Sequence, residues 1–279
     1  MTVQTRTQTE QTALSARQVA WRVTRLNLRA QLDYRAEFLI MIAIGAIWQV
    51  SIIVFATVLL GRFSGMGDWP SDAVLMIAAM RMLSHGLFVL FFGRVSYLSQ
   101  LVQEGQVDGY LLRPMPVHRQ VQLAFFPTNA IGDLLVGASM FVGAVVTVQL
   151  RWTALHVVYV AAAVLGGMLV EAAIHTALSA FHLHYPGAAA WTHWVQELLE
   201  TFGNYPLKIL PGLFEGLFTF VLPLAFVAYL PAAVLTGHTH GLLVPWSVAA
   251  AAPLLGLAFY LLSRLLWNAG LSRYTGVNG

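Results

Sequence analysis

The sequence contains no cysteine, a single lysine and few charges of either sign. Without cysteine, the chain has no disulfide framework and no thiolate metal site. Its one lysine, Lys208, follows the letters NYPL, so the pattern G-x-x-x-x-G-K-[ST] is absent and the chain does not bind ATP through a P-loop. Charged residues make up only 10% of the 279 residues, whereas soluble domains average about 25%. This composition excludes a disordered chain and a coiled coil.

Long apolar runs take the place of charge. Hydrophobic residues make up 58% of the chain, and its mean hydropathy is +0.71. A helix of about 20 apolar residues is long enough to cross the hydrocarbon core of a bilayer. Six such runs are present, at 38–60, 73–92, 121–148, 154–181, 211–235 and 242–267. We therefore predict an all-α polytopic membrane protein with six transmembrane helices, because in lipid each backbone group must bond within its own segment.

The basic residues indicate how these helices cross the membrane. With a cytoplasmic N-terminus, twelve of the fifteen Arg and Lys residues fall in cytoplasmic segments and two in external loops, while Arg81 lies within a span. This distribution predicts an N-in, C-in topology, with residues 37–270 forming one transmembrane domain. We therefore interpret the net charge of +3 as a sign of membrane orientation, and we expect no nucleic-acid partner.

Shorter segments flank the predicted domain. Residues 1–15 are polar and are predicted to form a disordered tail, and residues 271–279 form a second tail. Residues 16–36 have an apolar face beside a stripe of Arg22, Arg25 and Arg29, which predicts an amphipathic helix in the cytoplasmic interface with its arginines near anionic headgroups. The alternative is that 16–36 is the solvated start of the first span. A second amphipathic helix is expected on the inner surface at 188–202.

No catalytic or metal-binding motif is present. The patterns G-x-S-x-G and H-E-x-x-H do not occur. Four histidines are close in sequence, namely His175, His182, His184 and His193, but no acidic or thiol partner lies at zinc spacing. We therefore expect no catalytic residue, no metal site and no bound cofactor in this chain.

Two segments have an unusual distribution of glycine and proline. Residues 103–116, between the second and third spans, read QEGQVDGYLLRPMP, and their prolines predict a short rigid loop at 99–120 on the cytoplasmic surface. Residues 204–210 read NYPLKIL, and residues 218–232 read FTFVLPLAFVAYLPA. Pro223 is expected to kink the fifth span. Pro231 is expected to break that span before the outer surface and to leave a partly re-entrant end at 232–240.

Both segments resemble signatures of the ABC-2 type permease family, the membrane subunits of bacterial ABC exporters. The first matches the pattern E-G-x-x-D-x-x-L-L-R-P-x-P at 104–116. The second matches Y-P-L-K-I at 205–209 and T-F-x-x-P-x-A-F-x-x-Y-x-P-A at 219–232, with Ala228 where this branch more often has Asn. With its six-span order, the resemblance extends over nearly the whole chain after residue 15.

The resemblance implies a function and a set of partners. The chain would be a multi-pass permease subunit in a bacterial inner membrane, itself not an enzyme, exporting a substrate by alternating access. ATP and Mg would be bound by a separate ATP-binding subunit, present in two copies, and a second permease chain, identical or homologous, would complete the path.

The resemblance also places a coupling helix in the loop at 99–120. The coupling residues would be Glu104, Gly105, Asp108, Tyr110, Leu111, Arg113 and Pro114. We expect the charged members to make polar contacts to the ATP-binding subunit, and Tyr110 and Leu111 to fill its groove.

Several ionisable residues fall inside predicted spans. Arg81 and Asp133 lie at similar depth near the midplane, and charges in a membrane are usually paired, so we predict an Arg81–Asp133 pair. His85, with Glu171 and His175 at i, i+4 spacing, would extend this network. A proton relay would use the same residues, so the alternative function is a proton-coupled secondary transporter that depends on Arg81, Asp133, Glu171 and His175.

Overall fold

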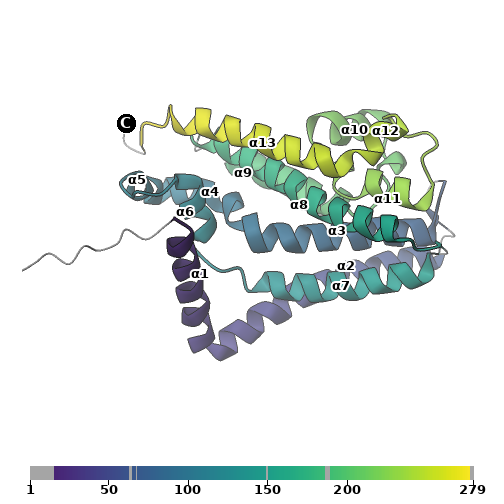
Figure 1. Cartoon of the computed structure of the whole chain (residues 1–279), viewed down its shortest axis with the longest axis horizontal. Coiled ribbons are helices and arrows are strands. Elements are labelled where there is room, and N and C mark those ends of the chain that lie inside the picture. Colours follow the sequence, from purple (N-terminus) through teal and green to yellow (C-terminus); the bar gives the residue numbers. More distant parts are fainter. Residues whose placement is uncertain (1–15, 63–64, 67, 149, 186–188, 277–279) are drawn as a thin grey trace, which may run out of the picture.

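The molecule is an elongated bundle of helices (Figure 1). The computed structural model describes residues 16–62, 65–66, 68–148, 150–185 and 189–276. The short helices α4, α5 and α6 lie at one end of the bundle together with the end of α13, and we call this the α5 end. The short helices α11 and α12 lie at the opposite end, which we call the α11 end. The predicted tail 1–15 and residues 277–279 of the predicted tail 271–279 lie outside the described residues.

Five long helices make up most of the bundle. They are α2 (Arg35–Arg62), α3 (Ser71–Phe92), α7 (Asn129–Thr147), α8 (Ala154–His182) and α13 (Ala252–Leu271). In the described residues, four helical stretches are long and apolar enough to cross a membrane, at 71–103, 129–147, 154–182 and 252–271. A two-residue antiparallel pair, β1 (Gly65–Met66) with β2 (Trp69–Pro70), closes the α2–α3 connection. The all-α membrane class is therefore confirmed.

Helix α1 (Ala16–Asp33) is separate from the first long helix. The chain bends at Tyr34, and α1 lies across the direction of the bundle at the α5 end (Figure 1). The Asn27 Nδ2 donates a hydrogen bond to the carbonyl oxygen of Leu123 at 2.7 Å, and the Gln31 Nε2 donates to that of Phe126 at 2.6 Å. These two side chains lie one helical turn apart, so a single face of α1 binds the segment that leads into α7.

The third predicted span begins too early. Residues 117–123 form the short helix α6 (Val117–Leu123), residues 124–128 are not α-helical, and α7 begins only at Asn129. Pro127 lacks a backbone donor and restricts Phe126, which favours a break at this point. The predicted span at 121–148 therefore merges two helices that the structure separates.

Helices α2 and α7 pack at very short distance because each has a glycine at the contact. A Cβ atom added to Gly132 would overlap the carbonyl oxygen of Ile42, and one added to Gly45 would overlap that of Asn129. Small residues allow the backbones of membrane helices to approach and to gain dispersion energy. By contrast, Gly143, farther along α7, faces open space.

Replacing Gly132 by Ala is expected to destabilise the chain by roughly 1–3 kcal/mol, because the added methyl group has no room between the two backbones. The matched variant Gly143→Ala should be neutral or stabilising by up to about 1 kcal/mol, since Ala favours a helix over Gly. Thermal unfolding of the two purified variants in detergent would compare them. Equal midpoints would contradict the close contact between α2 and α7.

Residues 189–210 run from the α5 end towards the α11 end. Helix α9 (Ala189–Phe202) is followed by a 3-10 turn, η3 (Leu207–Ile209), and the Lys208 Nζ donates to the carbonyl oxygen of Gly241 at 3.0 Å, next to α11. The twelve basic residues that the sequence analysis assigns to the cytoplasmic side include Lys208, and this assignment is wrong because Lys208 lies at the end opposite residues 99–120. The amphipathic helix predicted at 188–202 is present as α9, with Leu199 and Thr192 buried and Trp191 and Trp194 exposed, but it runs along the bundle and not across the α5 end. Packing against the bundle produces the same amphipathic pattern as an interface does.

The predicted span at 211–235 is broken into pieces. These are α10 (Gly212–Gly216), the π-helical turn η4 (Leu217–Val221), the 3-10 turn η5 (Leu224–Phe226) and α11 (Tyr229–Thr236), followed by α12 (Trp246–Ala250). The helical turns stop at Pro223, as its missing donor favours. Pro231 does not break a helix, because it lies in the first turn of α11, where a backbone donor has no partner within the helix.

Residues 211–245 dip into the bundle and return to the α11 end. A Cβ atom on Gly167 of α8 would overlap the carbonyl oxygen of Val227, which places Val227 well inside the bundle. Two residues later the ring of Tyr229 lies 5.2 Å from that of Trp69, in the α2–α3 connection. Phe218 and most of residues 224–235 are buried in the main apolar core with Met76, Ile77 and Met80 of α3. We call 211–245 the re-entrant segment.

Candidate coupling site and buried polar cluster

The segment between α3 and α7 forms three short helices at the α5 end. Helix α3 continues through a 3-10 turn, η1 (Gly93–Tyr97), into α4 (Leu98–Gln103), and then come α5 (Gln106–Leu111) and α6. Gly105 has a φ of 69°, a left-handed conformation that glycine adopts without steric penalty, and it turns the chain between α4 and α5. We call residues 98–123 the coupling segment, after the role that the sequence resemblance implies for them.

The coupling segment is fastened to the long helices by a second apolar core. Its members are Val95, Leu98, Leu101, Val102, Val107, Tyr110, Val117, Val121, Ala180, Leu183 and Trp267, with Leu271 and Tyr274 packed against them. We call this group the end cluster. Because Ala180 belongs to α8 and Trp267 to α13, the coupling segment packs directly on both helices.

Hydrogen bonds fix the turn that follows α5. The Gln120 Nε2 donates to the carbonyl oxygens of Tyr110 at 2.8 Å and Met115 at 2.6 Å, and the Arg113 amide donates to the carbonyl oxygen of Tyr110 at 3.3 Å. The Arg113 guanidinium lies 5.4 Å from the centre of the Tyr110 ring, within the range of a cation–π contact. The turn at 111–116 is therefore held from inside the chain.

One apolar side chain stands out from this fixed turn. Leu112 is 88% exposed, with the exposed residues Leu111, Arg113 and Pro114 beside it. We expected Tyr110 to enter the groove of a partner, but Tyr110 is only 9% exposed and belongs to the end cluster. Leu112 lies within the sequence motif but is not among the predicted coupling residues. The sequence does contain a signal for its exposure. Leu112 follows the last turn of α5, whose buried side is formed by Val107 and Tyr110.

The two acidic residues of the motif have neighbours within the chain. The Glu104 carboxylate accepts hydrogen bonds from Gln100 Nε2 and Gln106 Nε2, each at 2.7 Å. Asp108 lies beside the C-terminal residues: burial and the nearby Asp108 carboxylate raise the pKa of Tyr274 to about 12. Glu104 therefore bonds to residues on both sides of the α4–α5 turn, whereas Asp108 lies beside the residues that follow α13.

A buried polar cluster lies deep in the bundle, between α3 and α8. The Arg81 guanidinium forms an ion pair with Glu171 Oε1 at 2.5 Å, and His85 Nδ1 lies 2.8 Å from Glu171 Oε2. Arg81 and Glu171 are both buried. On the next turn of α8, His175 Nδ1 is 2.9 Å from the hydroxyl of Ser96. The cluster of Arg81, His85, Glu171 and His175 therefore joins α3 to α8 along several turns.

Asp133 makes no hydrogen bond or ion pair to this cluster within the described residues. The predicted Arg81–Asp133 pair does not form, because Arg81 points at α8, whereas Asp133 on α7 accepts a hydrogen bond from Gln49 Nε2 of α2 at 3.4 Å. The sequence gives the depth of each residue in its helix but not the direction of its side chain around the axis. Arg81 forms its ion pair with Glu171 of α8 instead of with Asp133.

Comparison with known families decides the identity of the chain. A family model described as "ABC-2 family transporter protein" matches residues 46–278, which covers most of the chain. The chain belongs to the ABC-2 transporter family. No curated protein and no solved structure matches it. As an ABC-2 transporter chain, it is a multi-pass membrane permease subunit of an ABC transporter, and the family implies an ATP-binding partner.

The residues of this ABC-2 transporter that match the family model include both the coupling segment and the buried polar cluster. It begins within α2, so α1 and the first turns of α2 lie before it. Family membership supports a permease subunit of an ABC transporter.

His118 of this ABC-2 transporter lies against Trp267 in the contact between α6 and α13. The two ring centres are 4.9 Å apart and nearly perpendicular, and His118 is buried. Burial, and to a lesser extent the nearby Arg264 guanidinium, lowers the pKa of His118 from its ordinary 6.5 to about 3. The ring is therefore neutral in the folded chain at physiological pH.

Acidification is expected to destabilise the contact between α6 and α13. Above pH 6.5 the imidazole is neutral in both the folded and the unfolded chain; below it, only the unfolded chain takes up the proton readily. The free energy of unfolding should therefore fall by about 1.4 kcal/mol per pH unit between these two pKa values, or about 2 kcal/mol at pH 5. The variant His118→Phe keeps the ring contact and should lose this part of the pH dependence in thermal unfolding. An unchanged pH dependence would contradict the assignment to His118.

Proposed function

We propose that this chain is the permease subunit of an ABC exporter and that its coupling segment docks on the ATP-binding subunit with Leu112 at the tip. The observation that supports this most directly is the contrast within the coupling segment. Val107 and Tyr110 are buried in the end cluster, whereas Leu112 is 88% exposed on a turn that hydrogen bonds hold in place. A rigid turn with one exposed apolar side chain is suited to fill a groove in a soluble partner.

The end cluster gives a route for force into the membrane. ATP and Mg would bind to the partner subunit, present in two copies, and its movement would displace Leu112. Because the coupling segment packs on α8 and α13 through Ala180 and Trp267, these two helices would tilt with it. Alternating access follows if the tilt opens one end of the bundle while it closes the other.

The α5 end is the cytoplasmic end in this proposal. With Lys208 placed at the α11 end, eleven Arg and Lys residues lie on the cytoplasmic side and three on the external side, so the positive-inside distribution is kept. Helices α2, α3, α7, α8 and α13 and the stretch 189–210 make six crossings, with both termini inside. The re-entrant segment then faces the outside of a bacterial inner membrane.

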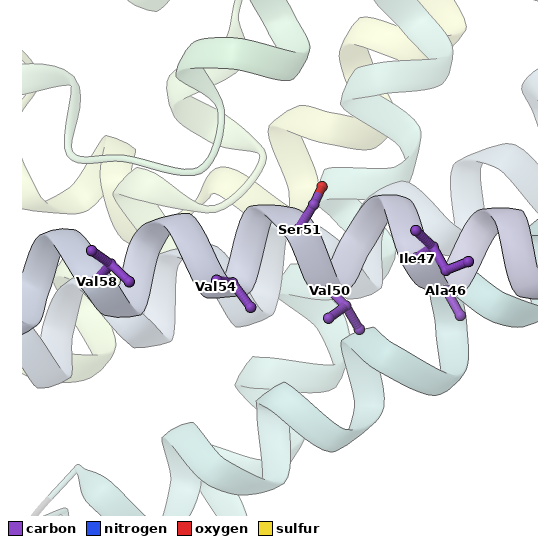
Figure 2. Close-up of a pocket in the computed structure, with 6 residues that line it drawn as sticks. All are labelled: Ala46, Ile47, Val50, Ser51, Val54 and Val58. Atoms are coloured by element: carbon purple, nitrogen blue, oxygen red, sulfur yellow. The ribbon is translucent and has the colours of Figure 1, made fainter.

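A second permease chain, identical or homologous, would complete the transport path. Helix α2 packs mainly on α7 and exposes an open apolar groove along its other side, lined by Ala46, Ile47, Val50, Ser51, Val54 and Val58 (Figure 2). The Ser51 hydroxyl in this groove donates a hydrogen bond to the carbonyl oxygen of Trp48 in the same helix at 2.6 Å. This face of α2 is therefore compatible with either lipid or the apolar helix of a second chain.

Affinity purification tests the proposal. The tagged chain, extracted from its native membrane in mild detergent, should bring with it a soluble protein that carries a P-loop, in an amount comparable to its own. Mass spectrometry would identify that protein and any second permease chain. A chain that purifies alone and transports in liposomes under a pH gradient without ATP would overturn the proposal and favour the proton-coupled carrier.

A further inference from the structure

Helix α1 has two faces with different surroundings. Asn27 and Gln31 face the protein and bind the carbonyl oxygens of Leu123 and Phe126, at the exit of the coupling segment. On the opposite face Arg22, Arg25 and Arg29 are exposed, spaced three and four residues apart. The helix is therefore clamped on one side and open to its surroundings on the other.

The open face combines charge with apolar flanks. In the described part of the chain, Arg22, Arg25 and Arg29 take part in no ion pair. Trp21 is 69% exposed on one side of the arginine stripe, and Leu26 is 64% exposed on the other. A basic stripe between exposed apolar side chains is complementary to a surface whose outer layer is anionic and whose inner layer is apolar.

We propose that this face of α1 is a binding site for the headgroups of anionic phospholipids. The position of the helix favours a lipid bilayer, and not a soluble acidic protein, as the binding partner of this face. The long apolar helix α2 begins two residues after α1 ends, so α1 lies at the level where the chain enters the membrane, and it runs across the bundle axis (Figure 1). Trp21 and Leu26 would enter the acyl boundary while the arginines contact phosphates.

Binding at this site would also fix the coupling segment. The clamp formed by Asn27 and Gln31 connects the headgroup layer to the peptide bonds between α6 and α7. The height of that linker above the membrane would then depend on whether α1 is bound to lipid. This consequence rests on the proposed function, whereas lipid binding itself does not.

The absence of cysteine makes the test direct. A single Ala30→Cys variant places a unique label on an exposed position of α1. The chain would carry an environment-sensitive fluorophore there and be reconstituted alone in nanodiscs of phosphatidylcholine, without or with about one third phosphatidylglycerol. We expect a blue shift with the anionic lipid, because it draws α1 into the interface. At about 1 M salt, where the screening length falls to about 3 Å, the shift should disappear.

Two charge variants identify the groups responsible. The variant Arg22→Gln/Arg25→Gln/Arg29→Gln should lose the shift, since each basic residue contributes about five-fold to binding at an anionic surface and three contribute about a hundred-fold. The matched variant with three lysines keeps the charge and should keep the shift. An identical emission in both lipid mixtures, or a shift that survives in the glutamine variant, would overturn the proposal. A shift that appears only when an ATP-binding subunit is added would assign this face to a protein partner instead.

Discussion

Replacing Leu112 by Asp is expected to abolish both co-purification of the ATP-binding subunit and ATP-dependent transport. The leucine side chain contributes about 1.5–3 kcal/mol when it is fully buried, and a carboxylate in the same groove adds a desolvation penalty. Together these effects weaken binding by at least about 100-fold. Affinity purification of the variant and ATP-driven uptake into inverted vesicles would measure the two losses.

The fold of the permease itself should not change in this variant. Leu112 is 88% exposed and is not a member of the end cluster. The thermal unfolding midpoint of the Leu112→Asp variant in detergent should therefore match that of the unsubstituted chain. The control variant Leu112→Met keeps an apolar side chain of similar volume and should retain the partner. Normal co-purification with Leu112→Asp would show that the tip of the coupling segment is not the docking site.

Replacing Glu171 by Leu is expected to destabilise the chain by about 3–5 kcal/mol. The substitution leaves the Arg81 guanidinium buried without its counter-ion, and it removes the carboxylate oxygen next to His85. A loss of this size is a large fraction of the stability of a typical fold. We expect poor yield of the variant in the membrane and a strongly lowered thermal midpoint.

The double variant Arg81→Met/Glu171→Leu separates structure from transport. Removing both charges leaves no unpaired ion, so stability should return to near that of the unsubstituted chain. If the pair only joins α3 to α8, the double variant should also transport with ATP. A double variant that is stable but inactive would show that these charges take part in transport, as the proton-relay hypothesis requires.

Long helices could be predicted from the sequence with good accuracy. The predicted span at 154–181 differs by one residue from α8 (Ala154–His182), because an uninterrupted apolar run of that length has few alternatives to a buried or membrane helix. The break near Pro223 also follows from local chemistry, because proline lacks a backbone donor. The coupling segment was located by its glycine and proline pattern.

The arrangement around each helix axis could not be predicted. Arg81 and Asp133 do lie within their helices as expected, but their directions differ, so Arg81 pairs with Glu171. Tyr110 was expected to contact a partner and is buried instead, because the residues that cover it, such as Trp267, lie far away in the sequence. The amphipathic character of α9 was predicted but its direction along the bundle was not, because a face of exposed tryptophans and a face of buried residues fit both a membrane surface and the outside of a bundle.

The dependence of the coupling segment on α13 has a consequence for the order of biosynthesis. Val107 and Tyr110 leave the ribosome long before Trp267 and Tyr274, which are needed to cover them. Chains fold from the N-terminus during synthesis, so the apolar face of α5 stays uncovered until the last helix, α13, has been inserted. An incomplete chain would therefore lack the docking turn that we propose, and the ATP-binding subunit would be recruited only by permeases whose insertion is complete.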